Sequence, residues 1–100
     1  MRVPPVDVGL GEVATIQPTW HCLLRFRQRG RHPAGTDAAI AELRAILEDA
    51  HVDRWPPPWA AGQQADRWAV SGDWAFPLER VAGSVWAAPT CLRRGMRARA

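Results

Sequence analysis

The 100-residue sequence contains no lysine, asparagine or tyrosine, so all 13 of its basic residues are arginines. The three missing residue types have A/T-rich codons, whereas alanine, arginine, glycine, proline and tryptophan are abundant. This pattern indicates a G+C-rich genome. The number of arginines therefore says little about a ligand, and their positions in the chain say more.

Long apolar runs are also missing. No stretch approaches the roughly 18 apolar residues that a membrane-spanning helix needs. Prolines and acids interrupt residues 1–13, where a secretory signal would need continuous apolar residues. With 47% hydrophobic residues, the chain is long enough for a single core. We therefore expect a soluble, cytoplasmic protein with one domain over residues 1–100 and no contact with a membrane.

Cysteine is scarce, because the chain has only Cys22 and Cys91. Neither belongs to a C-x-x-C pair, the spacing that a zinc site would favour. We expect reduced thiols that are buried as small hydrophobic groups. The sequence predicts no metal site and no cofactor.

Positive charge is concentrated in two segments that contain no acid. They are Arg25, Arg27, Arg29 and Arg31, and Arg93, Arg94, Arg97 and Arg99. These clusters carry eight positive charges, and the rest of the chain has a net charge of −5, which gives the total of +3. The molecule is thus polarised rather than uniformly basic.

A helix is predicted from about Trp20 to Gly30, after Pro18 breaks the chain and Thr19 offers a capping side chain. Steps of about 100° around this helix separate an apolar arc from a polar arc. The apolar arc contains Trp20, Cys22, Leu23, Leu24 and Phe26, and the polar arc contains His21, Arg25, Gln28 and Arg29. Arg27 falls within the apolar arc, so we expect it to reach solvent or to meet a buried acceptor.

The remaining pattern predicts one more helix and a sheet. Apolar residues at helical spacing predict the second helix over about fourteen residues from Asp37, with an acidic outer face. Short runs over 52–55, 66–72, 73–80 and 83–94 read as strands of an antiparallel meander. Pro77 and Pro89 suggest edge positions or bulges. We predict an α+β fold with two N-terminal amphipathic helices on a small sheet of three to four strands. Residues 1–17 would be an irregular arm with a short strand at 12–17, and residues 95–100 a basic, flexible tail.

The six tryptophans allow two interpretations. Trp20, Trp68 and Trp86 lie in periodic elements, which favours burial in the core. Trp55 and Trp59 flank three prolines. That segment is an exposed lip over a site, a ligand for another protein's aromatic groove, or a stiff loop fixed onto the sheet; the last interpretation is the simplest.

The polar arc of the first helix carries the strongest chemical signal. His21, Arg25 and Arg29 follow one another at intervals of four residues, so they stack about 6 Å apart on one helix face. An acid or base beside two guanidinium groups suits a phosphodiester, because the histidine moves a proton and the arginines stabilise phosphoryl oxygens. Thr90, Arg93 and Arg94 would add a hydroxyl and further cations if the last strand lies nearby. The simpler alternative is an arginine-rich, solvated face.

The pattern "H-x-x-x-R-F-x-x-R", a second amphipathic helix and a meander ending in "T-C-L-x-R" resembles the RelE-like small toxin ribonucleases. These belong to the barnase–EndoU–colicin–RelE superfamily, and the pattern also resembles related bacterial domains with an "H-x-x-x-R-x-x-x-R" helix. The resemblance implies metal-independent RNA cleavage, in which the ribose 2′-hydroxyl attacks the adjacent phosphate and leaves a cyclic phosphate. His21 would be the acid or base, Arg25 and Arg29 would bind the phosphate, and Thr90 and Arg93 would occupy polar strand positions. Members often use a tyrosine, a lysine or a carboxylate in the site, whereas this chain has no tyrosine or lysine and no carboxylate stands in the cluster.

The sequence therefore predicts a toxin-type endoribonuclease or an RNA-binding relative. Arg27, Arg31, Arg93 and Arg94 would contribute to nucleic-acid binding. The expected partners are RNA, free or on the ribosome, and an inhibitory protein. The alternative is a non-enzymatic interaction protein of the phage or toxin–antitoxin type, which binds an acidic protein or nucleic acid through the arginine face.

Overall fold

The computed structural model describes residues 2–9, 11–30, 35–60 and 62–95. In chain order, the elements are β1 (Val6–Asp7), β2 (Thr15–Pro18), α1 (Trp20–Gly30), α2 (Thr36–Asp49), β3 (His51–Asp53), the 3-10 turn η1 (Pro58–Ala60), β4 (Arg67–Ser71), β5 (Trp74–Ala82), β6 (Val85–Ala88) and β7 (Leu92–Arg93). Strands thus precede the two helices as well as follow them. Arg31 and all but the first residue of the predicted basic tail lie outside the described residues.

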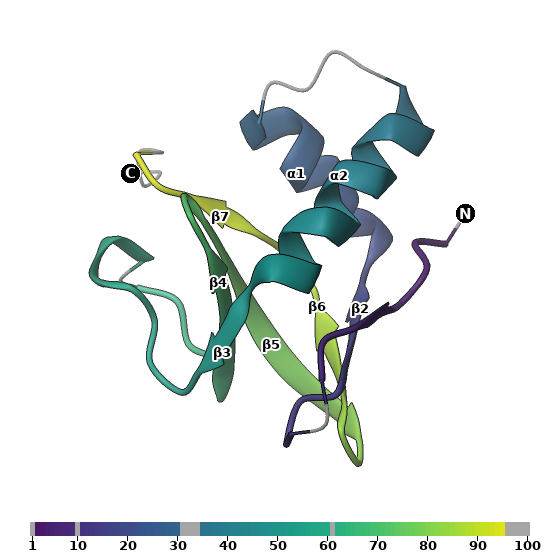
Figure 1. Ribbon diagram of the computed structural model, residues 1–100. Coiled ribbons are helices and arrows are strands. Elements are labelled where there is room, and N and C mark those ends of the chain that lie inside the picture. Colours follow the sequence, from purple (N-terminus) through teal and green to yellow (C-terminus); the bar gives the residue numbers. More distant parts are fainter. Residues whose placement is uncertain (1, 10, 31–34, 61, 96–100) are drawn as a thin grey trace.

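The strands form one curled, mixed sheet that resembles half of a barrel (Figure 1). Their order is β1–β2–β6–β5–β4–β3, and β7 pairs with β5 beside this path. β2 runs parallel to β6, and the other neighbouring pairs are antiparallel. The prediction of two N-terminal helices on a small antiparallel sheet is therefore wrong, because the sheet has seven strands and begins before the first helix.

The N-terminal segment is part of the fold and not an irregular arm. Four of its apolar side chains are buried in the main core, namely Val3, Val6, Val13 and Ile16. Ile16 pairs with Trp86 across the parallel β2–β6 contact. The two strands contain only two and four residues, which is too short for a clear alternating pattern. β1 pairs with β2, and the other partner of β2, β6, lies about 70 residues later. The predicted strand at 12–17 overlaps β2.

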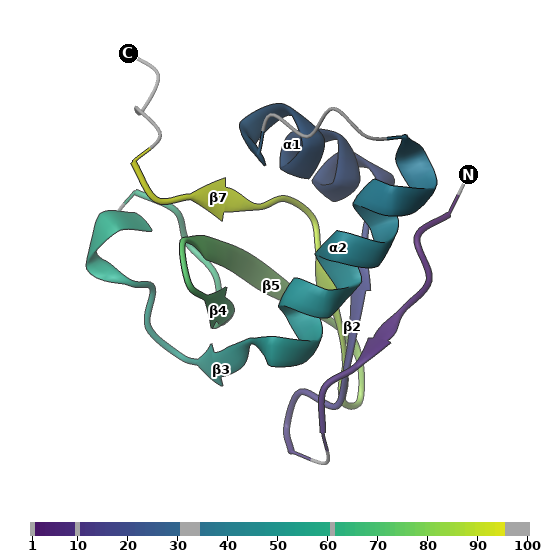
Figure 2. The same cartoon turned by 45° about the horizontal axis from the view of Figure 1, so that its top comes forward.

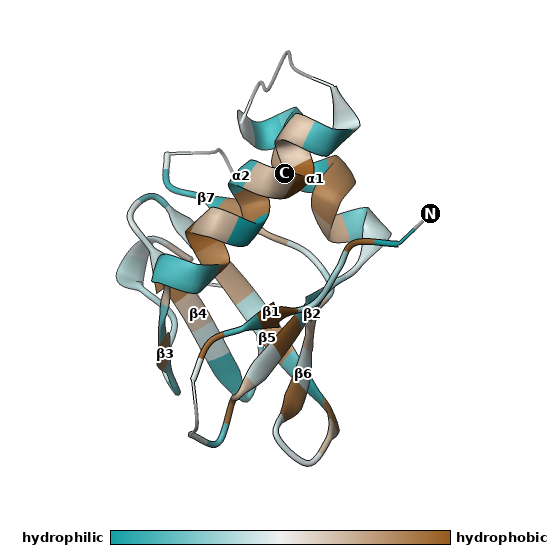
Figure 3. Ribbon diagram, turned by 45° about the vertical axis from the view of Figure 1, so that its right-hand side comes forward, coloured by the Kyte–Doolittle hydropathy of each residue, from teal (hydrophilic) through white to brown (hydrophobic). Residues whose placement is uncertain are grey.

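Both predicted helices form, and they pack on the same core. Thr19 caps α1 through its hydroxyl, which accepts a hydrogen bond from the Cys22 backbone N–H at 3.0 Å. α1 buries Cys22, Leu23 and Phe26, and α2 buries its own apolar row, while its acidic side chains remain exposed. Figure 3 shows hydrophilic and hydrophobic segments alternating along both helices. The amphipathic pattern therefore predicted both helices and their buried faces in outline.

A second, smaller cluster of buried residues lies on the face of β5 that is turned away from the main core. Trp68, Ala75, Leu92 and Ala60 are buried there, and Trp59 packs against them. The segment with three prolines is thus fixed to the sheet through Trp59, as the simplest interpretation predicts. Trp55, at the other end of this segment, is 72% exposed.

The tryptophans of the periodic elements do not all lie in the core. Trp68 and Trp86 are 1% and 3% exposed, so their predicted burial is confirmed. Trp20 is 36% exposed and Leu24 is 47% exposed, so the apolar arc of α1 is narrower than predicted. The reason is that the side of α1 that faces the core carries Cys22, Leu23 and Phe26, whereas Trp20 and Leu24 lie at the margin of that side.

Two prolines shape the C-terminal strands. Pro77 is buried in β5 and does not occupy an edge strand; it lies between the part of β5 that pairs with β7 and the part that pairs with β6. Pro89 divides the predicted strand over 83–94 into β6 and β7. The two pieces pair with opposite ends of β5, and the link between them passes beside α1.

Candidate functional site

The start of α1 is attached to the link between β6 and β7. The Thr19 hydroxyl donates to the Pro89 carbonyl oxygen at 3.1 Å, and the Thr19 backbone N–H donates to the Ala88 carbonyl at 3.1 Å. The same hydroxyl caps the helix by accepting from Cys22. One side chain therefore begins α1 and also holds it against a segment that lies 70 residues later in the chain.

The two cysteines form the next contact between α1 and the β6–β7 link. Both are fully buried, and the Cys91 thiol donates to the Cys22 carbonyl oxygen, with the sulphur 3.8 Å from it. The hydrogen bond with Cys91 raises the pKa of the Cys22 thiol well above its ordinary value, and burial adds to this effect. These thiols are therefore packing groups, as predicted, and not nucleophiles.

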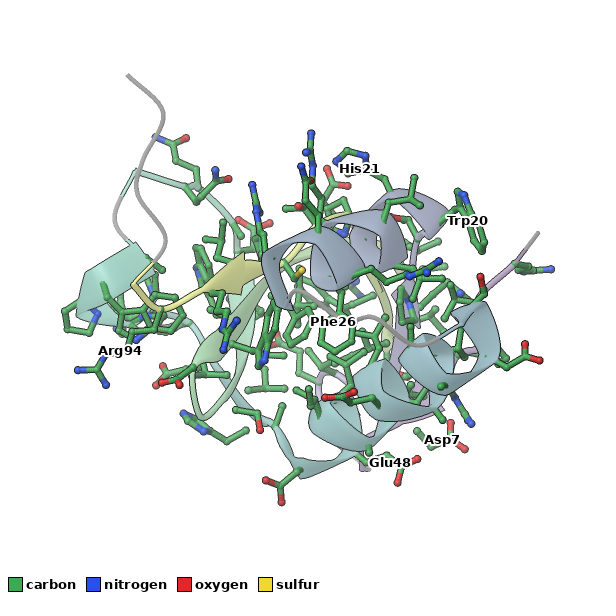
Figure 4. All side chains as sticks on the ribbon, turned by 90° about the horizontal axis from the view of Figure 1, so that it is seen from above. Asp7, Trp20, His21, Phe26, Glu48 and Arg94 are labelled. Atoms are coloured by element: carbon green, nitrogen blue, oxygen red, sulfur yellow. The ribbon has the colours of Figure 1, made fainter. Side chains whose placement is uncertain are left out.

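The outer side of α1 carries the predicted histidine and its neighbour. Figure 4 shows His21 directed outward, with Phe26 on the inner side of the helix. The Arg25 Nε–H donates to His21 Nε2 at 3.3 Å, and Arg25 Nη1 donates to Gln28 Oε1 at 2.9 Å. The contact to Nε2 assigns the imidazole proton to Nδ1 when the ring is neutral. His21 and Arg25 thus form one hydrogen-bonded pair on an exposed face.

Arg29 and Arg93 link the end of α1 to β7, which lies beside α1 in Figures 1 and 2. Arg29 Nη1 donates to the Cys91 carbonyl oxygen. Arg93 Nη1 donates to the Arg29 carbonyl oxygen at 3.0 Å, and its guanidinium carbon lies 5.7 Å from the centre of the Trp74 ring. A cation at the C-terminal carbonyls of a helix is favourable, because the helix dipole is negative there. The two guanidinium groups are therefore held in place by backbone oxygens and by an aromatic ring.

Arg25, Arg29 and Arg93 have no acidic partner in the part of the chain that the structure describes. Among the residues that the structure describes, none of Arg25, Arg29 and Arg93 is in an ion pair, and the ion pair that is seen joins Arg67 to Glu12 elsewhere. Each of the three guanidinium groups uses one or two of its donors on neutral acceptors. Within the described residues, no further partner of their remaining N–H groups is seen, and a guanidinium in that state can donate to an anion.

The other predicted site residues lie in different places. Thr90 is half-buried in the β6–β7 link, directly before the Cys91 carbonyl that Arg29 contacts. Arg27 points toward α2, where its Nη1 donates to the Thr36 hydroxyl at 3.2 Å, so it has met the acceptor that its place in the apolar arc required. Arg94 is exposed and lies well apart from His21 (Figure 4). Arg31 is outside the described residues.

The structure adds two residues to the predicted set. Gln28 accepts from Arg25 and so belongs to the polar cluster; its place on the polar arc, three residues after Arg25, is a signal that was visible in the sequence. Trp20 lies on the outer side of α1 next to His21 (Figure 4). The sequence pattern did not indicate this position, because it predicted that Trp20 is buried in the core. The cluster therefore combines one imidazole, three guanidinium groups, one amide and an exposed indole.

Among the described residues, no three His, Cys, Asp or Glu side chains gather in a way that could hold a metal ion. No helix in that part of the chain is long and apolar enough to cross a membrane. Comparison with known proteins found no matching family model, no matching curated protein and no matching solved structure.

Proposed function

We propose that this chain is a toxin-type endoribonuclease that cleaves RNA without a metal ion, with His21, Arg25 and Arg29 acting on the phosphodiester. The observation that carries the proposal is the 3.3 Å hydrogen bond between His21 and Arg25 on a face whose arginines have no acidic partner among the described residues. A proton-transfer group lies directly beside donors that fit phosphoryl oxygens. The resemblance to RelE-like ribonucleases points to the same three residues.

The proposed step is an internal transfer at phosphorus. The ribose 2′-oxygen forms a bond to the adjacent phosphorus while the bond from phosphorus to the 5′-oxygen of the next nucleotide breaks. The 2′-hydroxyl loses a proton, the departing oxygen gains one, and a 2′,3′-cyclic phosphate remains. His21 carries one of these two protons through Nε2, after Arg25 turns from the ring to the phosphate, and water carries the other.

The arginines stabilise the charge that develops on the phosphoryl oxygens. Arg29 and Arg93 are held by backbone carbonyls, so little reorganisation is needed before their free N–H groups meet an anion. Thr90 adds a hydroxyl in the same link. The connection of the β6–β7 link to α1 supports the proposal, because it brings the "T-C-L-x-R" segment to the helix with which the resemblance pairs it.

The test is incubation of the purified chain with labelled RNA in EDTA, followed by analysis of the product ends. We expect cyclic phosphate ends from the wild type, and losses of at least 100-fold in His21→Ala, since acid–base catalysis typically contributes that much. Arg25→Ala should lose activity as well. Arg54→Ala is the matched control, because it removes one positive charge from the exposed end of β3.

Three results would overturn the proposal. They are intact RNA with the wild type, cleavage that EDTA abolishes, and equal activity of His21→Ala and Arg54→Ala. Circular dichroism of each variant is needed beside the activity. His21 is exposed, so its replacement by alanine should leave the fold intact.

A second candidate function is binding through the arginine face without cleavage. The observation that favours it is that no second acid or base joins His21 among the described residues; its side-chain partner there is Arg25. The ligand would be an acidic protein or a nucleic acid. Binding to phosphates should weaken steeply as the salt concentration rises, and the EDTA experiment would then give uncut RNA at every protein concentration.

The proposal also implies where the chain acts and what controls it. A ribonuclease of this type acts in the cytoplasm, on free or ribosome-bound RNA, and an inhibitory protein partner would need to cover the arginine face. Such a partner would present acids to Arg25, Arg29 and Arg93. Its binding should then protect His21 from chemical modification of the imidazole.

A further inference from the structure

Two rows of side chains run side by side along the outer face of α1. His21, Arg25 and Arg29 form one row at intervals of four residues, and Trp20, Leu24 and Gln28 form the next. Trp20 is 36% exposed and Leu24 is 47% exposed, although both are large and apolar. The hydrogen bond from Arg25 to Gln28 joins the two rows. A cationic row and a largely apolar row therefore share one surface.

The exposed indole of Trp20 lies beside a row that contains two arginines. This surface suits a ligand that carries both a flat ring and an anion. The buried residues of α1 are Cys22, Leu23 and Phe26, and Trp20 belongs neither to the main core cluster nor to the residues packed against it. In Figure 4 it lies at the N-terminal end of α1 and points outward, as His21 does. Aromatic rings beside arginines are the arrangement that single-stranded nucleic-acid binders use, because the ring stacks on a base while the cations hold the backbone.

We infer that Trp20, with Leu24, is a stacking platform for one nucleobase of a single-stranded RNA whose phosphates lie along His21, Arg25 and Arg29. This inference rests on the proposed function, since it names the form of RNA that the same face takes. Steps of four residues advance about 6 Å along the helix axis, so Arg25 and Arg29 are spaced for neighbouring phosphates. A base can reach Trp20 only when it is unstacked, which selects single strands over duplexes.

The charges around the face favour this occupant over an apolar protein segment. Arg25, Arg29 and Arg93 have no acidic partner among the described residues, so a neutral protein surface that covered Trp20 would leave cations without a counter-charge beside it. An RNA strand provides the apolar ring and the anion together. Gln28, at the far end of the apolar row, offers an amide to the edge of a second base.

The test separates binding from cleavage by using RNA in which every 2′-hydroxyl is methylated, so that the proposed nucleophile is blocked. Fluorescence anisotropy with a labelled single-stranded 12-nucleotide probe measures the Kd of the wild type, Trp20→Ala, Trp20→Phe and Leu24→Ala. Trp20→Ala should weaken binding by about five- to 150-fold, the range for loss of one stacked base. Trp20→Phe should retain most of the affinity. Trp55→Ala is the control, because Trp55 is more exposed but lies on a segment apart from α1 (Figures 1 and 2).

A second probe keeps the test independent of how the variants fold. An RNA of the same length with abasic riboses should bind the wild type more weakly than the ordinary probe, and Trp20→Ala should not distinguish the two. Equal affinity of the wild type for both probes would overturn the platform, as would a Trp20→Ala affinity equal to that of the wild type while Arg25→Ala binds weakly. In that case the apolar row would belong to a protein partner.

Different results would refute the stacking platform and the proposed cleavage. Binding of the methylated probe that depends on Trp20, together with intact ordinary RNA, supports the platform and removes the ribonuclease. Cleavage of ordinary RNA with the same KM in the wild type and in Trp20→Ala removes the platform alone. No binding of either probe and no cleavage overturns both.

Discussion

Replacement of Thr19 by alanine should loosen the attachment of α1 to the sheet. The Thr19 hydroxyl accepts from the Cys22 backbone N–H at 3.0 Å and donates to the Pro89 carbonyl at 3.1 Å. Thr19→Ala removes both hydrogen bonds at once, and the side chain is only half-buried, so little packing is lost. The substitution therefore measures the seam between α1 and the β6–β7 link with little other disturbance.

The magnitude follows from the two contacts. Loss of an N-cap side chain costs about 1 kcal/mol, and loss of one further hydrogen bond to a backbone oxygen costs about 1 kcal/mol. The total is about 2 kcal/mol in the free energy of unfolding. For a domain of this length, each kcal/mol lowers Tm by about 4–8 °C. We therefore expect Thr19→Ala to melt about 8–16 °C below the wild type.

Thermal unfolding followed by circular dichroism measures this difference, and Thr19→Ser is the matched control. Serine keeps the hydroxyl and loses only a methyl group, so its Tm should remain close to that of the wild type. An unchanged Tm in Thr19→Ala would refute the reasoning, because it would mean that the hydroxyl does not hold the seam. An equal loss in Thr19→Ser would assign the effect to the methyl group instead.

Two further predictions follow from the pKa shifts. Cys22 and Cys91 are buried and the pKa of Cys22 is raised, so a thiol reagent at pH 8 should modify both only slowly in the native protein and rapidly in guanidinium chloride; rapid reaction of the native protein would contradict this packing. The hydrogen bond from Arg67 lowers the pKa of Glu12 from 4.5. A lowered pKa stabilises the folded state above the unfolded-state value, and this stabilisation is lost as the pH falls through the folded-state pKa. The wild type should therefore melt above Glu12→Gln at pH 7 and not in strong acid, and a gap in Tm that persists in acid would show that the charge of Glu12 is not its cause.

The helices were predictable because their information is local. The bounds of α1 agree with the prediction, and α2 begins one residue before the predicted start at Asp37. A capping threonine and apolar residues at helical spacing are both visible within about fifteen residues. The acidic face of α2 and the burial of Leu23 and Phe26 followed from the same spacing.

The sheet was not predictable in the same way, because its size depends on distant partners. β1 and β2 are short, and β2 gains its place only by running parallel to β6. A short strand was predicted at 12–17, where β2 lies, but no local pattern shows that it joins the sheet through β6. A proline in β5 also suggested an edge, whereas Pro77 lies between the partners of two different segments of that strand.

The candidate site was also predictable only where its residues are close together in the sequence. The stacking of His21, Arg25 and Arg29 follows from their spacing on one helix. The contacts of Arg29 with Cys91 and of Arg93 with Arg29 span more than 60 residues, so they required the fold.

Pro89 lies where the last part of the sheet meets the predicted histidine helix. The sequence pattern treats residues 83–94 as one strand, whereas its pairing with β5 is interrupted after Ala87 and resumes at Leu92. Pro89 lies within this interruption, and its carbonyl accepts from Thr19 at the start of the helix. The chain then continues along α1 to Cys91 and Arg93, which contact Arg29 at the other end. The interruption between β6 and β7 is thus where the last part of the chain meets α1, and Arg93 adds a third guanidinium to the histidine helix there.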